Sequence, residues 1–376
     1  MLKTSVNLRV PGPTPVPEAV VEAGAQPMLN HRGPEFAAIM GEVLAGLVPF
    51  FGTAQEALLL TGSGTGAQEA AVVNMLSPGD EVLAITAGVF GERFAAIAEA
   101  FGAHVHRLYG EWGTATEPEA VAEALRDHPK THSVILTHNE TSTGVANDVA
   151  AIAAAIRGQP GIDPVILVDG VSSIGAIPFL MDAWDVDVAI TGSQKAWMSP
   201  PGLAMVVVSD RGWRAHAQAR MPRFYWDFTK ARKNGEKRTT PFTPAVGIVR
   251  ALQEALRMML EEGPEAVFVR HARVGDRIRD GIVGLGLELF ADLAHASNTV
   301  TAVRVPSDVD ASSLLRDLRT RHGVVLGSGQ DWLRGSIFRV GHMGWVHEAD
   351  VDHVLEALRL SLEDARRGEE PAVAAL

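Results

Sequence analysis

The chain has 376 residues, of which 47% are hydrophobic and 21% are charged, so it is long enough for two globular domains with a large buried core. Its formal net charge of −12 and pI near 5.5 argue against a nucleic-acid or anionic-membrane surface, because those partners need a dominant basic face. The sequence contains no cysteine, which excludes disulfides, thiolate metal ligands and a thiol nucleophile.

Hydropathy along the chain gives a first expectation about location. No run of residues approaches the roughly eighteen apolar positions that a membrane-spanning helix needs. The first ten residues, MLKTSVNLRV, lack the hydrophobic stretch of a signal peptide. We therefore predict a cytoplasmic protein.

The N-terminal segment, residues 1–35, is rich in proline. It contains the run Pro11-Gly-Pro13-Thr-Pro15-Val-Pro17 and ends in Asn30-His31-Arg32. Prolines at this density disfavour both helix and central strand. We expect an extended arm that closes over another part of the protein.

The next unit reads strand, glycine turn, helix. The apolar run ALLL at 57–60 precedes Thr61-Gly-Ser-Gly-Thr-Gly66 and the helical stretch AQEAAVVNML. A glycine turn that opens a helix after a strand aims backbone N–H groups at an anion such as a phosphate. A dinucleotide fingerprint is the alternative, but it calls for an acidic residue after the next strand, whereas Asp80 and Glu81 come before or at the start of that strand, EVLAIT.

Two further strand ends carry polar or aromatic residues. Phe90 sits in the turn 88–91 that follows EVLAIT and begins a helix running to Phe101, and it is either a core aromatic or a ligand contact. A strand near Val105 and a helix near 120–127 look structural.

The strand HSVILTHN ends in Asn139-Glu-Thr-Ser-Thr-Gly144, whose hydroxyls and amide suit hydrogen bonds to a ligand hydroxyl or carboxylate.

The stretch 165–205 contains the most informative residues. Its apolar runs 165–168 and 186–190 have the composition of buried parallel strands, and each stops at a polar cluster. Ligands of open α/β sheets sit outside the carboxyl ends of the strands, so Asp169 and Ser193-Gln194-Lys195 should face one crevice. The pair could form a plain salt bridge at the sheet edge.

The position of Lys195 suggests a chemical role for it. Lysine is rare in this chain, with six residues against 27 arginines, and Lys195 lies in an apolar segment flanked by glycine and proline. Desolvation disfavours the charged ammonium and leaves a nucleophilic amine, which can form a Schiff base. Asp169 could then pair with the protonated pyridine nitrogen of a cofactor.

The C-terminal part changes in character. A strand at 205–209 leads to a segment with five basic residues between Lys230 and Arg238, which we interpret as a surface loop. A long helical stretch, 244–285, follows, and then strands and helices of a second, smaller α+β domain. Arg339 lies inside one of these apolar strands, where a buried arginine needs an anionic partner and suits a carboxylate.

Together these motifs carry a resemblance. Asp169-Gly-Val-Ser-Ser, Gly192-Ser-Gln-Lys195-Ala and Pro200-Pro-Gly202 resemble the pyridoxal-phosphate (PLP) core of class V aminotransferases, in the alanine–glyoxylate and serine–pyruvate aminotransferase group. The resemblance extends from Pro11-Gly-Pro13 to Arg339. Cysteine desulfurases share this core but require a cysteine, which this chain lacks.

The resemblance implies a fold and an assembly. The fold is that of fold-type-I PLP-dependent transferases, an α/β architecture with a large doubly wound, mainly parallel sheet domain and a smaller C-terminal α+β domain. We assign residues 1–35 to the arm, 36–255 to the large domain and 256–376 to the small domain. The expected assembly is a homodimer with shared active sites.

The resemblance also implies site residues. Lys195 and Asp169 are catalytic, Phe90 stacks on the cofactor ring, and Thr243 reaches the phosphate of the neighbouring subunit. The full set of implied PLP contacts is Ser63, Gly64, Thr65, Phe90, Thr141, Asp169, Val171, Gln194, Lys195, Thr240 and Thr243. Two positions depart from the family pattern, since Thr240 stands where a tyrosine is common and Asn139 where a small residue is common.

Substrate contacts follow in the same way. Arg339 is assigned to the substrate carboxylate, and His31 and Arg32 either help to hold the substrate or form a solvated loop. No metal site is expected. The predicted reaction is amino transfer from alanine or serine to glyoxylate or pyruvate. Transamination of aspartate, a PLP-dependent lyase reaction, and a non-catalytic cofactor-binding protein are the alternatives.

Overall fold

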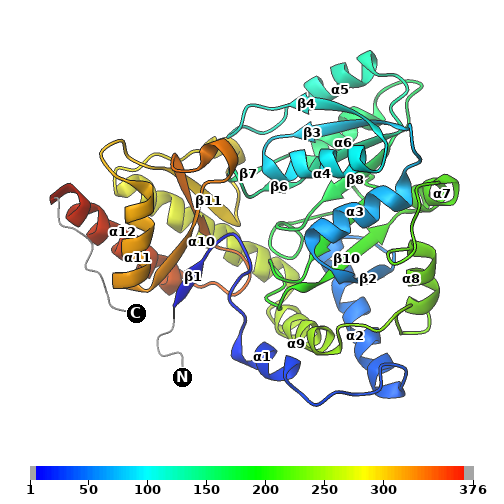
Figure 1. Ribbon diagram of the computed structural model, residues 1–376, viewed down its shortest axis with the longest axis horizontal. Coiled ribbons are helices and arrows are strands. Elements are labelled where there is room, and N and C mark those ends of the chain that lie inside the picture. The colour runs from blue at the N-terminus through cyan, green and yellow to red at the C-terminus, as the bar shows by residue number, and fades with distance from the viewer. Residues whose placement is uncertain (1–5, 368–376) are drawn as a thin grey trace.

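The computed structural model describes residues 6–367, whose elements form a large and a small unit around separate sheets (Figure 1). The large sheet has seven strands, in spatial order β2 (Ala57–Gly62), β10 (Gly202–Val208), β9 (Val188–Gly192), β8 (Val165–Asp169), β5 (Ser133–Thr137), β3 (Glu81–Thr86) and β4 (His104–Tyr109). The strands from β9 to β4 run parallel, while β10 is antiparallel to both β9 and β2. The predicted mainly parallel sheet is confirmed.

Helices cover both faces of this sheet because successive strand residues enter different cores. In β5, Val134 and Leu136 join one cluster of buried apolar side chains and Ile135 joins the other. The first cluster is covered by α2 (Pro34–Phe51), α5 (Pro118–Asp127), α6 (Val149–Arg157) and α9 (Val246–Glu262). The second is covered by α3 (Gly64–Met75), α4 (Val89–Ala100), α7 (Asp210–Gln218) and α8 (Phe228–Gly235). The sheet is therefore doubly wound.

The small unit is built on a four-stranded sheet. Its strands are, in spatial order, β1 (Asn7–Arg9), β12 (Val324–Ser328), β13 (Ile337–Gly341) and β11 (Val300–Arg304). Its apolar core is completed by α10 (Pro264–Gly284), α11 (Ala311–His322) and α12 (Glu348–Arg367). β1 belongs to the N-terminal arm and pairs parallel with β12. The two ends of the described chain therefore meet in one unit.

The predicted helical stretch 244–285 is two helices. Gly263 separates α9 from α10 with φ +88°, a left-handed conformation that glycine adopts without strain, and Pro264 begins α10. Val267 of α10 packs in the large unit, whereas Val274 and Ile278 pack in the small one. α10 therefore joins the two units.

One helix corrects the expectation about apolar runs. Among residues 6–367, α2 is 18 residues long with a mean hydropathy of 1.4, which passes the length and composition test for a membrane span. Its Phe36, Met40, Val43 and Leu47 are buried in the core of the large unit. Packing inside the protein accounts for this apolar sequence.

Candidate active site

Asp169 and Lys195 come from neighbouring parallel strands. Asp169 is the last residue of β8, and Lys195 follows the end of β9 in a turn where the Met198 N–H donates to the Lys195 carbonyl at 3.2 Å. Trp197 anchors this turn, because its buried ring donates from Nε1 to Thr191 Oγ1 at 3.0 Å and contacts the Phe50 ring edge-on at 5.4 Å. The local fold thus buries the lysine, which is 9% exposed.

The N-terminal arm lies against Lys195. The ammonium Nζ donates to the Pro11 carbonyl, and a Cβ on Gly12 would come within 2.7 Å of the lysine side chain. Gly12 also has φ +104°, so both its space and its conformation require glycine. Thr14 holds the arm in place through its Oγ1, which donates to the Lys195 carbonyl at 2.9 Å.

Burial changes the acid–base properties of both groups. The pKa of Lys195 is lowered to about 8, mainly by burial and also by the charge of Arg339, while Asp169 opposes the change. Burial raises the pKa of Asp169 to about 6, against the hydrogen bonds that favour the carboxylate. Within residues 6–367 neither side chain forms an ion pair, so the alternative of a plain Lys195–Asp169 salt bridge is wrong. The amine can act as a nucleophile near neutral pH.

Asp169 is held by two donors. The Val171 N–H donates to Oδ1 at 2.8 Å, and Gln68 Nε2 donates to Oδ2 at 2.6 Å. Gln68 lies on α3, four residues after Gly64 and hence on the same helix face, and we did not predict it. The four-residue spacing from Gly64 could have identified Gln68 from the sequence.

The glycine turn forms a small polar cradle. Ser63 caps α3, and its Oγ accepts from the Gly66 N–H at 3.2 Å. A Cβ on Gly192 would stand 3.1 Å from Gln194 Oε1 and 3.4 Å from the Gly64 nitrogen, so these two groups approach the same point. Gln194 Oε1 is buried without a hydrogen-bond partner. The N–H groups at the start of α3 suit a phosphate group, and the Gln194 side chain beside them can add a donor through its amide NH₂ group.

Phe90 and Val171 lie on elements that border the cradle. The Phe90 ring centroid is 5.9 Å from Lys195 Nζ and 4.7 Å from the Arg93 guanidinium. Val171 methyl groups lie 2.9 Å from the point where a Gly64 Cβ would be. Arg93, which we did not predict, donates to Thr65 Oγ1 at 3.3 Å and has no ion-pair partner within residues 6–367.

Arg339 is a second cation without a carboxylate partner in the described residues. Its side chain is buried on β13 and donates to the Ser328 carbonyl, to the Thr141 carbonyl at 2.9 Å and to Gln330 Oε1 at 2.9 Å. Burial lowers its pKa to about 10. Thr141, predicted as a ligand contact, thus gives its backbone carbonyl to the predicted carboxylate-binding arginine.

Asn139 connects the two units beside this arginine. Its Nδ2 donates to Ser172 Oγ at 2.8 Å and to Thr299 Oγ1 at 2.9 Å, and its Oδ1 accepts from Ser297. Asn139, which is larger than the small residue common in the family, therefore fills a buried polar junction between the loop after β8 and the edge strand β11.

Four predicted residues form a separate group, His31, Arg32, Thr240 and Thr243. Arg32 donates to Thr239 Oγ1 at 2.8 Å and to the carbonyls of Thr240 and Pro241. No hydrogen bond among the described residues joins this group to Lys195, Asp169 or Arg339. Thr243 is exposed.

Known proteins resemble the whole chain. A family profile described as "Aminotransferase class-V" matches residues 6–363. The soluble hydrogenase small subunit of Synechococcus sp. is 42% identical over 96% of this chain and 94% of its own. The L-aspartate–glyoxylate aminotransferase of Paracoccus denitrificans is 37% identical over 92% of this chain and 88% of its own. The serine–glyoxylate aminotransferase of Methylorubrum extorquens is 36% identical over 95% of this chain and 91% of its own.

Solved structures agree with these sequence relatives. The crystal structure of the alanine–glyoxylate aminotransferase from Nostoc sp. superposes with a TM-score of 0.91 at 31% identity, covering 96% of each chain.

The raised pKa of Asp169 predicts a pH-dependent stability for the cofactor-free protein. The folded state binds more protons than the unfolded state between pH 3.8 and about 6, so this group's stabilisation is complete below pH 3.8 and is lost as the pH rises through 6. The full difference is roughly 3 kcal/mol. Asp169→Asn should lack this change, as urea unfolding of both proteins between pH 4 and 7 would measure. The same pH dependence of the unfolding free energy in both proteins would contradict this prediction.

Proposed function

The chain belongs to the class V aminotransferases and is an enzyme that transfers amino groups, and on this premise we propose that it uses PLP to move the amino group of alanine or serine to glyoxylate or pyruvate. The observation that carries the proposal is the buried, unpaired couple of Lys195 and Asp169 at the ends of adjacent strands. Burying an amine and an acid together without pairing them costs free energy, which favours a role in binding or catalysis for the two groups.

The residues around the crevice fit PLP. The α3 N-terminus with Ser63, Gly64 and Thr65 would hold the phosphate, together with the Gln194 side chain, which would donate from its amide NH₂ group. Asp169 would pair with the pyridine nitrogen, and Phe90 and Val171 would enclose the ring. When bound, the cofactor supplies an electron sink for the negative charge that develops at the substrate Cα.

The chain's own groups perform the remaining tasks. Lys195 would hold the cofactor through Nζ, and as a free amine the same Nζ would accept the proton of the substrate Cα. Its lowered pKa lets it accept that proton near neutral pH. Asp169 would keep the pyridine nitrogen of the cofactor protonated, and Arg339 would orient the substrate carboxylate.

The names of the relatives favour glyoxylate as the acceptor, because three of the proteins compared act on glyoxylate with different amino donors. The donor depends on whether a second cation is available. A small donor needs Arg339 alone, whereas the distal carboxylate of aspartate would be desolvated without a partner. Alanine and serine therefore fit the site as we describe it.

Aspartate is a second candidate donor because one observation favours it. Arg93 is a cation without an ion-pair partner in the described residues, it lies beside Phe90, and it lowers the pKa of Lys195 through its charge. The Paracoccus relative is named for aspartate. Arg93 or Arg32 would supply the second charge.

The hydrogenase name is that of the Synechococcus protein. This sequence contains no cysteine, so it offers no thiolate ligand for an iron–sulfur cluster.

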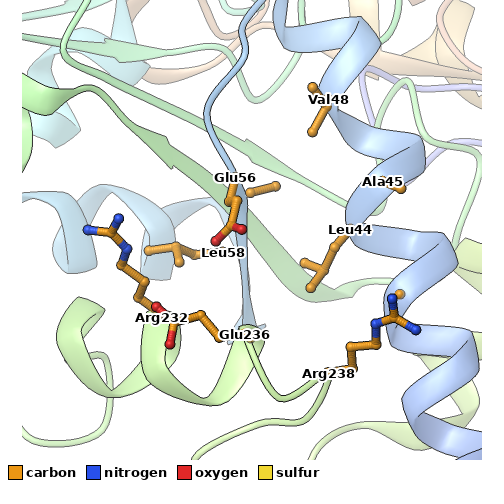
Figure 2. Close-up of a pocket in the computed structure, with 11 residues that line it drawn as sticks. Leu44, Ala45, Val48, Glu56, Leu58, Arg232, Glu236 and Arg238 are labelled. Atoms are coloured by element: carbon orange, nitrogen blue, oxygen red, sulfur yellow. The ribbon is translucent and has the colours of Figure 1, made fainter.

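A homodimer is part of the proposal, with the cytoplasm as its location. A groove of about 340 Å³ lies between α2, the start of β2 and α8, with an apolar wall that includes Leu44 and Val48 (Figure 2). It also holds charges of both signs, Glu56 and Glu236 against Arg232 and Arg238, so the same surface can pair with itself about a two-fold axis. The segment carrying Thr243 continues from Arg238.

The first test is the half-reaction. PLP-loaded enzyme mixed with alanine or serine should convert its cofactor to the amine form, and glyoxylate should restore the aldehyde form, as visible absorbance would follow. Lys195→Ala should abolish both conversions because Lys195 is the only buried lysine among residues 6–367. Release of a substrate fragment with the aldehyde form retained would indicate a lyase, and turnover by Lys195→Ala would refute the assignment.

The donor preference is tested by kcat/KM for alanine, serine and aspartate at saturating glyoxylate. Arg339→Ala should impair every donor by roughly tenfold or more, since it loses charge-assisted hydrogen bonds. Arg32→Ala and Arg93→Ala should leave alanine nearly unchanged. A wild-type preference for aspartate that either of these two variants removes would establish the aspartate alternative.

The dimer proposal predicts that Thr243→Val weakens PLP binding, because a hydroxyl from the partner subunit would be lost from the phosphate. The loss should be roughly 1.5–3 kcal/mol, or about tenfold or more in the dissociation constant. Titration of the cofactor-free enzyme with PLP measures it, and Thr239→Val on the same segment is the control. An unchanged dissociation constant would contradict a shared site.

A further inference from the structure

Glu140 is a buried carboxylate to which the proposed reaction assigns no role. It is the second residue of β6 (Asn139–Glu140) and is 1% exposed. Its Oε2 accepts from the N–H groups of Phe90 at 3.0 Å and Gly91 at 3.1 Å. Its Oε1 accepts from the N–H of Ser142 at 3.0 Å and from the hydroxyl of Ser142 at 2.6 Å. Within residues 6–367 no lysine or arginine forms an ion pair with it.

On one side Glu140 caps α4. The helix N-cap, Gly88, has no side chain to satisfy the first N–H groups, and the segment around Glu140 supplies the acceptors instead. Ser142 Oγ accepts from the Val89 N–H at 3.0 Å, next to the two N–H groups that Glu140 binds. A Cβ on Gly88 would lie 2.5 Å from Glu140 Cγ, so glycine makes room for the carboxylate. The backbone position of Phe90 thus depends on Glu140.

On the other side the same carboxylate shapes the turn that carries Thr141. Both donors on Oε1 come from Ser142, which fixes the backbone on either side of Thr141. The Thr141 carbonyl accepts from Arg339 Nη1 at 2.9 Å. The negative charge of Glu140 also favours the charged form of Arg339, against the desolvation that lowers the arginine's pKa.

We propose that Glu140 is a positioning residue that sets Phe90 and Arg339 relative to each other, and so aligns the cofactor ring with the substrate carboxylate. The inference rests on the proposed function, in which Phe90 stacks on PLP and Arg339 binds the carboxylate. Productive geometry at an active site tolerates shifts of only about 0.5 Å, so a group that holds both contacts affects cofactor and substrate together.

The test is Glu140→Gln in the PLP-loaded enzyme. Glutamine keeps the shape but places an NH₂ group against one of the two pairs of donors, so one pair is lost. We expect the visible circular dichroism per bound PLP to change and the KM values for alanine and glyoxylate to rise by roughly ten- to a hundredfold, with kcat less affected. Glu140→Asp keeps the charge but is one methylene too short for both pairs, and it should show the same two changes.

Asp187→Asn is the matched control for general destabilisation. Asp187 is equally buried at 1% and also accepts from a backbone N–H and a hydroxyl, those of Ile166 and Ser209, but it belongs to an arginine cluster with Arg157 and Arg211. It should lower Tm without changing the circular dichroism or KM. Ser142→Ala, a milder variant that keeps the carboxylate, should change both readouts in the same direction as Glu140→Gln but by less.

Each outcome is decisive for the inference. Wild-type circular dichroism and KM in Glu140→Gln or Ser142→Ala, or the same changes in Asp187→Asn at an equal fall in Tm, would overturn it. If the wild-type enzyme converts its cofactor with alanine while Glu140→Gln behaves like wild type, only this inference fails. If the wild-type enzyme converts no amino acid, the proposed function fails and this inference fails with it.

Discussion

Desolvation of an amine and an acid at the ends of two adjacent strands is the constraint on which the rest of this structure depends. The register that pairs Asp169 with Ile190 brings the end of β8 beside the end of β9, from which the chain turns to Lys195. Burial pushes the pKa values of the two groups toward each other. Burial therefore makes the charged forms of both groups less favourable than in water, at a free-energy cost that the surrounding core must offset.

The charged side chains around the crevice are stabilised by hydrogen bonds and not by ion pairs. Arg339 and Lys195 are cations, Asp169 and Glu140 are acids, and each is held mainly by backbone or amide groups. Hydrogen bonds from neutral groups stabilise a charge while leaving it free to meet a charged ligand. Ion pairs of the described protein lie elsewhere, as in the cluster of Asp187 with Arg157 and Arg211.

The crevice is closed by parts of the chain that are distant in sequence. β1 pairs with β12 in the small unit, and directly after it Pro11 and Gly12 contact Lys195 in the large unit. Asn139 adds a second junction, from the end of the large sheet to the edge of β11. The arm therefore joins the small unit to the lysine. The sequence does not reveal this connection, because the arm and the small domain lie at opposite ends of the chain.

The sequence by itself determined the mainly parallel sheet, the order of its motifs and the lysine and aspartate at its strand ends, because strand composition, glycine turns and a lysine in an apolar segment are local signals. Only the tertiary structure decided which groups surround them. Gln68, Glu140 and Pro11 became partners of the site through packing between elements far apart in the chain, and no local pattern encodes such a pairing. The break at Gly263 could have been anticipated from Gly263-Pro264, but the division of α10 between two cores could not.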